Sequence, residues 1–186
     1  MSTSLKPIRI GLIGYGYAGR TFHAPLIDAV PGMVPATIAS SRSDAVRSGR
    51  PDTIWVVDRA EMLRDEAIDV VVVATPNDSH AHWAHAALEA RKHVVVEKPF
   101  ALDLAEAHAL TQLAKQHARL LSVFHTRPWD SDYLTVKRAI QDGAIGRVVH
   151  FESHIDRFRI EVRQRWREGA GPGAGIWYDL TPHLID

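Results

Sequence analysis

Residues 8–19 read IRIGLIGYGYAG, a short apolar run followed by glycines at positions 14, 16 and 19. The order of strand, G-x-G-x-x-G turn and helix is the context that a dinucleotide-binding turn requires. Phosphates bind at such a helix N-terminus because its free N–H groups and its dipole favour negative charge. A tight turn that binds nothing is the alternative interpretation. The residues predicted to bind phosphate are Gly14, Gly16, Tyr17, Ala18 and Gly19.

The three glycines have separate expected roles. Gly14 forms a turn that a Cβ would obstruct, Gly16 leaves room for a pyrophosphate against the backbone, and Gly19 lets the following helix pack close to the strand.

The composition is that of an ordinary globular protein. The 186 residues are 46% hydrophobic and 24% charged, with a formal net charge of zero. Nothing in this balance indicates a nucleic-acid or membrane surface, so we expect neither partner. The N-terminal MSTSLKP lacks the apolar segment of a leader peptide, which favours a cytoplasmic location. The absence of cysteine excludes disulfides, zinc–thiolate sites, iron–sulfur clusters and cysteine nucleophiles.

A strand-then-helix pattern repeats up to about residue 125. The run DVVVVA at 69–74 is typical of a strand buried on both faces. Pro25 is expected to kink or split the first helix. The repeat predicts an α/β fold with a doubly wound parallel sheet. Further strands are expected at 34–40, 53–57, 69–74, 93–96 and 120–124, and helices at 17–30, 58–66, 79–90 and 102–118.

Small hydroxyls and an arginine follow the second predicted strand, where proteins that prefer NAD place Asp or Glu. Ser41 and Arg42 can instead donate to a ribose 2′-phosphate, and a guanidinium group matches a phosphate in shape. We therefore predict NADP as the cofactor. NAD is the alternative if Asp44 contacts the ribose or if Arg42 simply faces solvent.

Two more loops follow strand ends, at the edge where open α/β sheets bind ligands. TPNDSH at 75–80 follows the fourth strand, and EKPF at 97–100 follows the fifth. A lysine in that position, Lys98, suits a catalytic cation, with an exposed loop lysine as the alternative. No metal is expected, because the histidines near 80–85 lack a carboxylate or cysteine at ligand spacing.

The pattern changes after residue 125, so we expect two domains, 1–125 and 126–186. A helix is predicted at 130–141, and one long half-buried strand at 147–159 would begin a second sheet. The final helix, 176–186, contains Pro182: either Pro182 lies in its first turn with Asp179 near the N-cap, or the helix starts earlier and is bent. One strand and one helix cannot cover a sheet face, so the chain is either a fragment or is completed by a partner.

Several of these segments together resemble one family. GYGYAG, TPNDSH, EKPF and YDLTPHLID, in that order, are similar to motifs of the Gfo/Idh/MocA family of NAD(P)-dependent enzymes. YGYAGRTFHAPL (15–26) and FESHIDRFR (151–159) with GIWYD (175–179) are closer to its NADP-linked scyllo-inositol dehydrogenase-like branch. That branch commonly has asparagine where this chain has Thr126, before Arg127.

The resemblance covers essentially all of the chain and implies a Rossmann domain followed by an α+β domain. The second domain would carry an open, mostly antiparallel sheet with the substrate site and often the oligomer interface. Family members usually run well beyond this length. The resemblance thus implies that most of the second domain is missing here and that the full-length form is a homo-oligomer.

The resemblance also assigns roles residue by residue. It makes Lys98 the lysine near the nicotinamide and the substrate, and makes Asp179 and His183 the aspartate and histidine of the catalytic signature. The implied reaction is hydride transfer between the nicotinamide and a secondary alcohol of a polyol, inositol or sugar-like substrate. His183 would take the hydroxyl proton, Asp179 would orient it, and Lys98 would hold the substrate oxygen. The residues implied along the cofactor are Thr75, Pro76, Asn77, His80, Glu97 and Lys98.

Two alternative functions stay open. The family includes a transcriptional repressor, so the chain could be a non-catalytic dinucleotide-binding regulatory protein. Retention of Lys98, Asp179 and His183 argues against this alternative. The end at Asp186 motivates the other, an inactive truncated remnant of the enzyme. The residues given do not identify the substrate or the oligomeric state.

Overall fold

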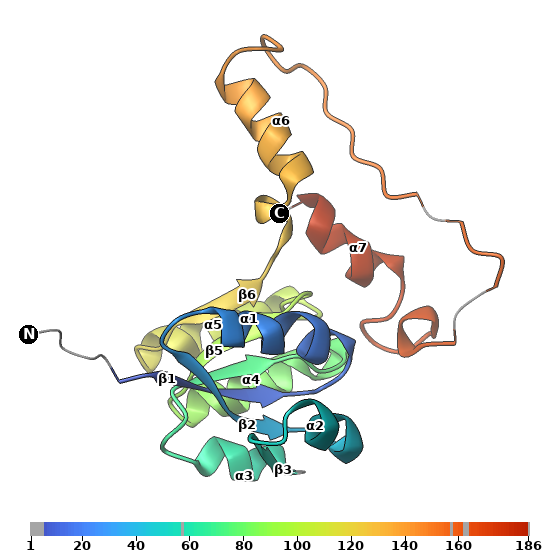
Figure 1. Ribbon diagram of the computed structural model, residues 1–186. Coiled ribbons are helices and arrows are strands. Elements are labelled where there is room, and N and C mark those ends of the chain that lie inside the picture. Colours follow the sequence, from blue (N-terminus) through green and yellow to red (C-terminus); the bar gives the residue numbers. More distant parts are fainter. Residues whose placement is uncertain (1–5, 57, 157, 162–163, 186) are drawn as a thin grey trace, which may run out of the picture. The chain divides into compact units, whose positions relative to one another are not determined.

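The computed structural model describes residues 6–56, 58–156, 158–161 and 164–185 (Figure 1). It divides into two compact units, Met1–Val123 and Phe124–Asp186, where the sequence analysis placed the boundary after residue 125. The MSTSL start, Val57, Arg157 and Asp186, all part of predicted segments, lie outside the described residues. Among the described helices, none has the length and apolar character needed to span a membrane.

The first unit is built on a six-stranded sheet in the order β3-β2-β1-β4-β5-β6. Figure 1 shows β6 at the upper edge of this sheet and β3 at the lower edge. The chain moves outward from β1 in one direction and then, from β4, in the other, so the reversal lies between β1 and β4. The predicted doubly wound parallel sheet is confirmed. The strands are β1 (Ile8–Ile13), β2 (Met33–Ala39), β3 (Ile54–Val56), β4 (Val70–Val73), β5 (His93–Glu97) and β6 (Leu121–Phe124).

Helices cover both faces of the sheet, which explains why its central strands are apolar throughout. Along β4, Val71 and Val73 belong to the hydrophobic cluster beneath α3, α4 and α5, whereas Val72 belongs to the cluster beneath α1 and α2. Alternate side chains of a strand point to opposite faces, so a strand covered on both faces needs no polar positions. The helices are α1 (Ala24–Ala29), α2 (Ser43–Gly49), α3 (Arg59–Arg64), α4 (His80–Glu89) and α5 (Leu104–Gln116), and α2 was not predicted.

Pro25 is accommodated by a change of helix type, in line with the predicted disturbance. The helix that follows the glycine turn contains a π-helical turn, η1 (Gly19–His23), and continues as α1. The Ala24 N–H donates to the Gly19 carbonyl, five residues back. A proline ring crowds the carbonyl four residues before it, and the wider turn relieves that crowding.

After Phe124, the last residue of β6, the described residues of the second unit form helices and no strand. Its helices are η3 (Arg127–Trp129), α6 (Ser131–Gln141), η4 (Trp166–Glu168) and α7 (Ile176–Ile185). The strand predicted at 147–159 is wrong for the residues that are described, which form an extended segment without regular structure (orange in Figure 1). A strand needs a neighbour to satisfy its N–H and C=O groups, and the described part of this unit offers none.

The last helix settles the open question about Pro182. Helix α7 begins at Ile176, so Pro182 lies inside it and Asp179 lies in its first turn, not at the N-cap. The second of the two predicted arrangements is therefore the one observed, with the helix starting before the proline.

Candidate active site

The glycine turn lies at the carboxyl end of β1, against the end of β4. Gly14 has a φ of +99°, and a Cβ there would overlap the Ala74 carbonyl oxygen and lie 2.8 Å from its carbon. A Cβ on Gly19 would overlap the Gly14 carbonyl oxygen. These two glycines are therefore required by close backbone approach, as the sequence predicts.

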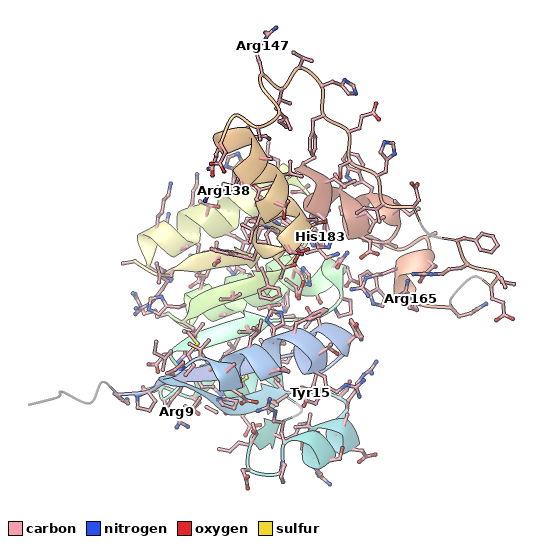
Figure 2. The ribbon with its side chains drawn as sticks, turned by 45° about the horizontal axis from the view of Figure 1, so that its top comes forward. Arg9, Tyr15, Arg138, Arg147, Arg165 and His183 are labelled. Carbon is pink, nitrogen blue, oxygen red and sulfur yellow. The ribbon has the colours of Figure 1, made fainter. Side chains whose placement is uncertain are left out.

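Gly16 differs from its two neighbours in the motif. A Cβ at this position would meet no atom within 4 Å, so packing within the protein does not explain the glycine. The open space is what a pyrophosphate lying against the backbone needs. Tyr17 beside it is 68% exposed, while Tyr15 is buried in the core (Figure 2). The local geometry thus fits the phosphates of a dinucleotide.

The end of β2 presents hydroxyl and guanidinium groups. Ser41 and Arg42 are exposed, and the Arg42 N–H donates to the Ser40 hydroxyl at 3.1 Å. Trp55 on β3 donates its ring N–H to the Ser40 carbonyl at 2.8 Å, and the Arg47 guanidinium lies 5.1 Å from the centre of that ring. The indole and the second arginine were not foreseen from the sequence, since they come from β3 and from the unpredicted helix α2.

The loop after β4 begins with a half-buried threonine and an exposed proline and then turns inward. The Ser79 hydroxyl donates to the Thr75 hydroxyl at 2.8 Å, and Asn77 is buried at the start of the 3₁₀ turn Asn77–Ser79. Pro76 is exposed. Thr75 and Pro76 therefore lie at the edge of the sheet where β4 ends.

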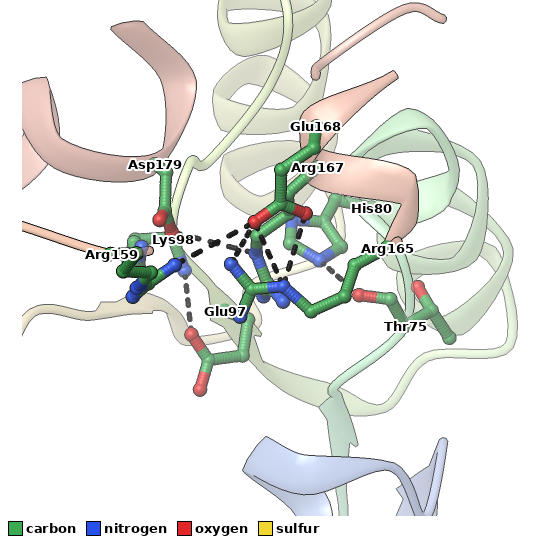
Figure 3. Close-up of polar contacts among 9 residues, drawn as sticks. All are labelled: Thr75, His80, Glu97, Lys98, Arg159, Arg165, Arg167, Glu168 and Asp179. Carbon is green, nitrogen blue, oxygen red and sulfur yellow. Dashed lines mark hydrogen bonds and ion pairs between the residues drawn. The ribbon is translucent and has the colours of Figure 1, made fainter. Parts of the chain in front are cut away.

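His80 is placed differently, because its ring is completely buried. Its Nδ1 lies 2.8 Å from the Pro99 carbonyl oxygen and its Nε2 lies 2.9 Å from the Thr75 carbonyl oxygen. The second contact is drawn in Figure 3. Both ring nitrogens are thus engaged by the backbone. The predicted contact between His80 and the cofactor stays a prediction, and the ring could make it only by breaking these contacts.

The EKP segment at the end of β5 is anchored by a buried pair that the sequence analysis missed. His23 Nε2, on η1, lies 2.9 Å from Glu97 Oε1, and both residues are buried. Glu97 Oε2 accepts from the Lys98 N–H at 3.1 Å (Figure 3). Lys98 itself is partly exposed, and the peptide bond to Pro99 is cis. Nothing in the local pattern around His23 indicates this pairing, since its partner lies 74 residues away.

Within the second unit, Asp179 and His183 lie four residues apart on α7, and so on one side of that helix. Asp179 Oδ1 lies 3.4 Å from Arg167 Nε. His183 is labelled in Figure 2. A cavity of about 560 Å³ in this unit is lined by charged groups that include Asp179, Arg159 and Glu168 (Figure 3). Among the described residues, no three His, Asp or Glu side chains gather as metal ligands.

In the first unit, the loops predicted to hold the cofactor meet at one edge of the sheet. The glycine turn, the Thr75 loop and the Lys98 turn follow β1, β4 and β5, which are neighbours in the sheet. Ligands of open α/β sheets bind where the strand order reverses, here between β1 and β4. A cation at the end of β5 can stabilise negative charge that develops on a substrate oxygen.

Comparison with known proteins gives matches along nearly the whole chain. The sequence model of the oxidoreductase family with an NAD-binding Rossmann fold (Gfo/Idh/MocA) matches residues 8–125. The model of the GFO/IDH/MocA C-terminal domain matches residues 133–186.

The individual relatives are oxidoreductases about twice as long as this chain. It is 55% identical to the uncharacterized oxidoreductase YdgJ of Escherichia coli over 96% of its own length and 52% of that protein. Two scyllo-inositol 2-dehydrogenases of Bacillus subtilis also match: IolW, the NADP⁺ enzyme, is 38% identical over 96% of this chain and 50% of IolW, and the NAD⁺ enzyme is 29% identical over 96% and 52%.

The solved structures agree with these matches. The structure of YPO2259 from Yersinia pestis superposes with a TM-score of 0.88 at 51% identity, covering 96% of this chain and 50% of the other. The chain therefore spans about half the length of the curated relatives and of the solved structure that it matches.

Proposed function

The chain belongs to the Gfo/Idh/MocA family of oxidoreductases, and from this premise we propose that the protein transfers hydride between NADP and a secondary alcohol of a polyol, inositol or sugar-like substrate. The observation that carries the proposal is the glycine turn, in which Gly14 and Gly19 are needed for packing while Gly16 faces open space. A relative named scyllo-inositol 2-dehydrogenase supports the substrate class.

The cofactor would be held by backbone groups and by three loops of the first unit. The N–H groups beside Gly16, Tyr17 and Ala18 would bind the pyrophosphate, and Thr75 and Pro76 would line the path to Lys98. When bound, the nicotinamide supplies the redox chemistry by accepting the hydride. The protein orients the reacting carbon and accepts the proton of the substrate hydroxyl.

We assign the proton chemistry to the three residues that the family resemblance implies as catalytic. As the alcohol C–H bond gives up its hydride and the C=O bond forms, we propose that His183 takes the hydroxyl proton. Asp179 would orient and charge-stabilise His183, and Lys98 would hold the substrate oxygen and stabilise negative charge on it. Each of these three roles is supported by the family resemblance of its own motif.

The preference for NADP is the finer part of the proposal, since the relatives include both an NADP⁺ and an NAD⁺ enzyme. Support comes from the exposed Ser41 and Arg42 at the end of β2, where a carboxylate would favour NAD. Asp44 lies in the first turn of α2 and is also exposed, so a direct comparison of the two cofactors is needed.

The test is a fluorescence titration of this chain with NADPH and, separately, with NADH. We expect saturable binding that favours NADPH. Gly16→Ala should weaken both cofactors by about tenfold or more, because its Cβ would occupy the space for phosphate. Arg42→Ala should weaken NADPH alone, by about 10- to 100-fold, because hydrogen bonds to charged groups are worth roughly 1.5–3 kcal/mol.

Arg138→Ala is the matched control, because Arg138 pairs with Asp142 on the second unit, far from β2 in the sequence. It should leave both affinities unchanged. Absence of binding to either cofactor would overturn the proposal for this chain, and equal loss of NADPH and NADH in Arg42→Ala would overturn the assignment of the 2′-phosphate site. In a chain of the relatives' length, Lys98→Ala and His183→Ala should reduce turnover steeply while cofactor binding survives.

A further inference from the structure

Lys98 stands between two residues that are each held by a buried histidine from another part of the chain. Glu97, before it, is held by His23, and Pro99, after it, is held by His80. We propose that His23 and His80 are positioning residues that clamp the Glu97–Lys98–Pro99 turn and thereby fix where the Lys98 ammonium group is presented. The catalytic use of Lys98 rests on the proposed function, whereas the positioning of the turn by the two histidines does not.

On the Glu97 side, the Glu97 carboxylate links His23 to the backbone of Lys98. One Glu97 oxygen lies 2.9 Å from His23 Nε2, and the other accepts the Lys98 N–H at 3.1 Å. His23 is 3% exposed and Glu97 is 8% exposed, so water does not compete strongly for these groups. The carboxylate therefore connects the helix that follows the glycine turn to the backbone of Lys98.

The clamp on the Pro99 side joins two loops. The His80 ring lies 2.9 Å from the Thr75 carbonyl oxygen (Figure 3) and, on its other side, 2.8 Å from the Pro99 carbonyl oxygen. Carbonyl oxygens only accept, so the ring nitrogen that carries the hydrogen donates to the carbonyl it faces. The ring is held between the two backbones and fixes the distance between the loop after β4 and the turn after β5.

The distribution of histidines favours this role over ordinary core packing. Among the described residues, the histidines classed as buried are His23 and His80, and both end on the same three-residue turn. An apolar side chain in place of His23 would remove the partner of one oxygen of the buried Glu97 carboxylate, and one in place of His80 would remove a partner of the Pro99 carbonyl, which is costly. The other described histidines are half-buried or exposed, and His82 and His85 on α4 are among the exposed ones.

The chain supplies matched controls for a test. His117 makes the same kind of contact away from the turn, with Nδ1 at 2.8 Å from the Leu88 carbonyl oxygen. Lys92 is a buried lysine whose Nζ donates to the Asp65 carbonyl at 2.7 Å, so its amine reacts with a reagent only when the fold opens. At an unchanged Lys92 rate, a change in the acylation rate of Lys98 divided by that of Lys92 therefore reports release of the turn and not general unfolding.

The experiment measures that ratio by mass spectrometry in this chain, with acetic anhydride as the reagent, for His23→Leu, His23→Gln, His80→Leu and His117→Gln. We expect His23→Leu and His80→Leu to change the ratio by about fivefold, the size of one lost net hydrogen bond. His23→Gln retains a donor for Glu97 and should stay within about twofold of the parent, as should His117→Gln.

A ratio in His23→Leu and His80→Leu equal to that of the parent would overturn the proposal, because the two lysines would then respond only to unfolding. An equal change in His117→Gln would overturn it as well. The labelling needs no cofactor, so its outcome is separate from the NADPH titration. If the ratio changes while NADPH does not bind, the clamp stands and the proposed function fails.

Discussion

The two units of this chain differ in what holds their elements. In the first unit, every strand lies beside another and two clusters of buried side chains occupy the two faces of the sheet. In the second unit, helices α6 and α7 bury none of their described residues, and several large apolar side chains are exposed. Examples are Trp129, Val149, Phe158, Ile160 and Trp177. The difference shows that a strand pattern becomes a strand only beside another strand, whereas the helical patterns of α6 and α7 form helices although none of their described residues is buried.

Two apolar stretches make the lesson specific. The sequence predicts strands at residues 69–74 and 147–159, the first from a continuous apolar run and the second from an alternating one. The first lies between β1 and β5 and forms the centre of a sheet, whereas the second has no neighbour among the described residues. A helix satisfies most of its backbone N–H and C=O groups within itself, whereas a strand needs a neighbouring strand to satisfy them.

The largest expected contrast is in amide hydrogen exchange. Amides of β4 should be protected by about 10³-fold or more relative to the acid-unfolded chain, because they open only with the whole unit. Amides at 148–156 should exchange within about tenfold of the unfolded rate, since they make no backbone hydrogen bond within the described part of the chain. Mass spectrometry of peptic fragments gives both values. Strong protection at 148–156 would show that the segment finds a partner strand in solution.

The next contrast compares two glycines with positive φ. Gly14→Ala should lower the free energy of unfolding by about 4 kcal/mol or more. The added Cβ would overlap the Ala74 carbonyl, and the φ of +99° is unfavourable for alanine. Gly143, at the end of α6, has a φ of +70° and open space around it, so Gly143→Ala should cost only about 1 kcal/mol. Urea unfolding followed by circular dichroism measures both. Equal losses would mean that the close approach at Gly14 relaxes.

The glycine turn shows how far the sequence predicts a fold. The motif spacing, with the apolar strand before it, predicted three separate backbone requirements, and the geometry at Gly14 and Gly19 confirms two of them directly. The parallel sheet followed from the same repeat. Helix α2 was missed because its sequence, SDAVRSG, is short and polar and buries only Val46. The strand at 147–159 was wrong because alternation says nothing about whether a partner strand is present.

The candidate site was predictable in position but not in its internal contacts. Loops after strands could be located from the strands themselves, so Thr75 and Lys98 lie where the sequence put them, at the ends of β4 and β5. The pairing of His23 with Glu97 joins residues 74 positions apart, and no local pattern encodes it. Likewise, the burial of His80 depends on Pro99, which approaches it only in the folded unit.

A smaller contrast comes from removing apolar side chains from each unit. Leu110 on α5 is 2% exposed within the larger cluster, so Leu110→Ala should cost about 3 kcal/mol through lost burial and a residual cavity. Phe158 is 91% exposed, and Phe158→Ala should stay within about 0.5 kcal/mol. Urea unfolding measures both losses, as shifts of the midpoint at an unchanged dependence of the free energy of unfolding on urea concentration. A large loss for Phe158→Ala would reveal a contact of that ring that forms in solution, for example with a second copy.

The smallest expected effect concerns an exposed ion pair of the second unit. Arg165 donates to both Glu168 oxygens, with Nε at 2.9 and 3.0 Å, and this holds the pKa of the Glu168 carboxyl below its ordinary value of 4.5. A carboxyl with a lowered pKa contributes stability that is present above pH 4.5 and is lost as the pH falls through the lowered value. Because solvent screens the pair, Glu168→Gln should leave the melting temperature at pH 7 unchanged within error.

The titration of Glu168 itself measures the pair more directly than stability does. The side-chain carboxyl ¹³C signal should titrate with a midpoint below 4.5 and should return toward 4.5 in Arg165→Gln, since the main donor is then gone. Arg138→Gln removes a comparable pair with Asp142 on α6 and should leave the Glu168 midpoint where it was. A midpoint at or above 4.5 in the parent chain would mean that the Arg165–Glu168 contact does not persist in solution. The turn Trp166–Glu168 would then be without the ion pair that spans it.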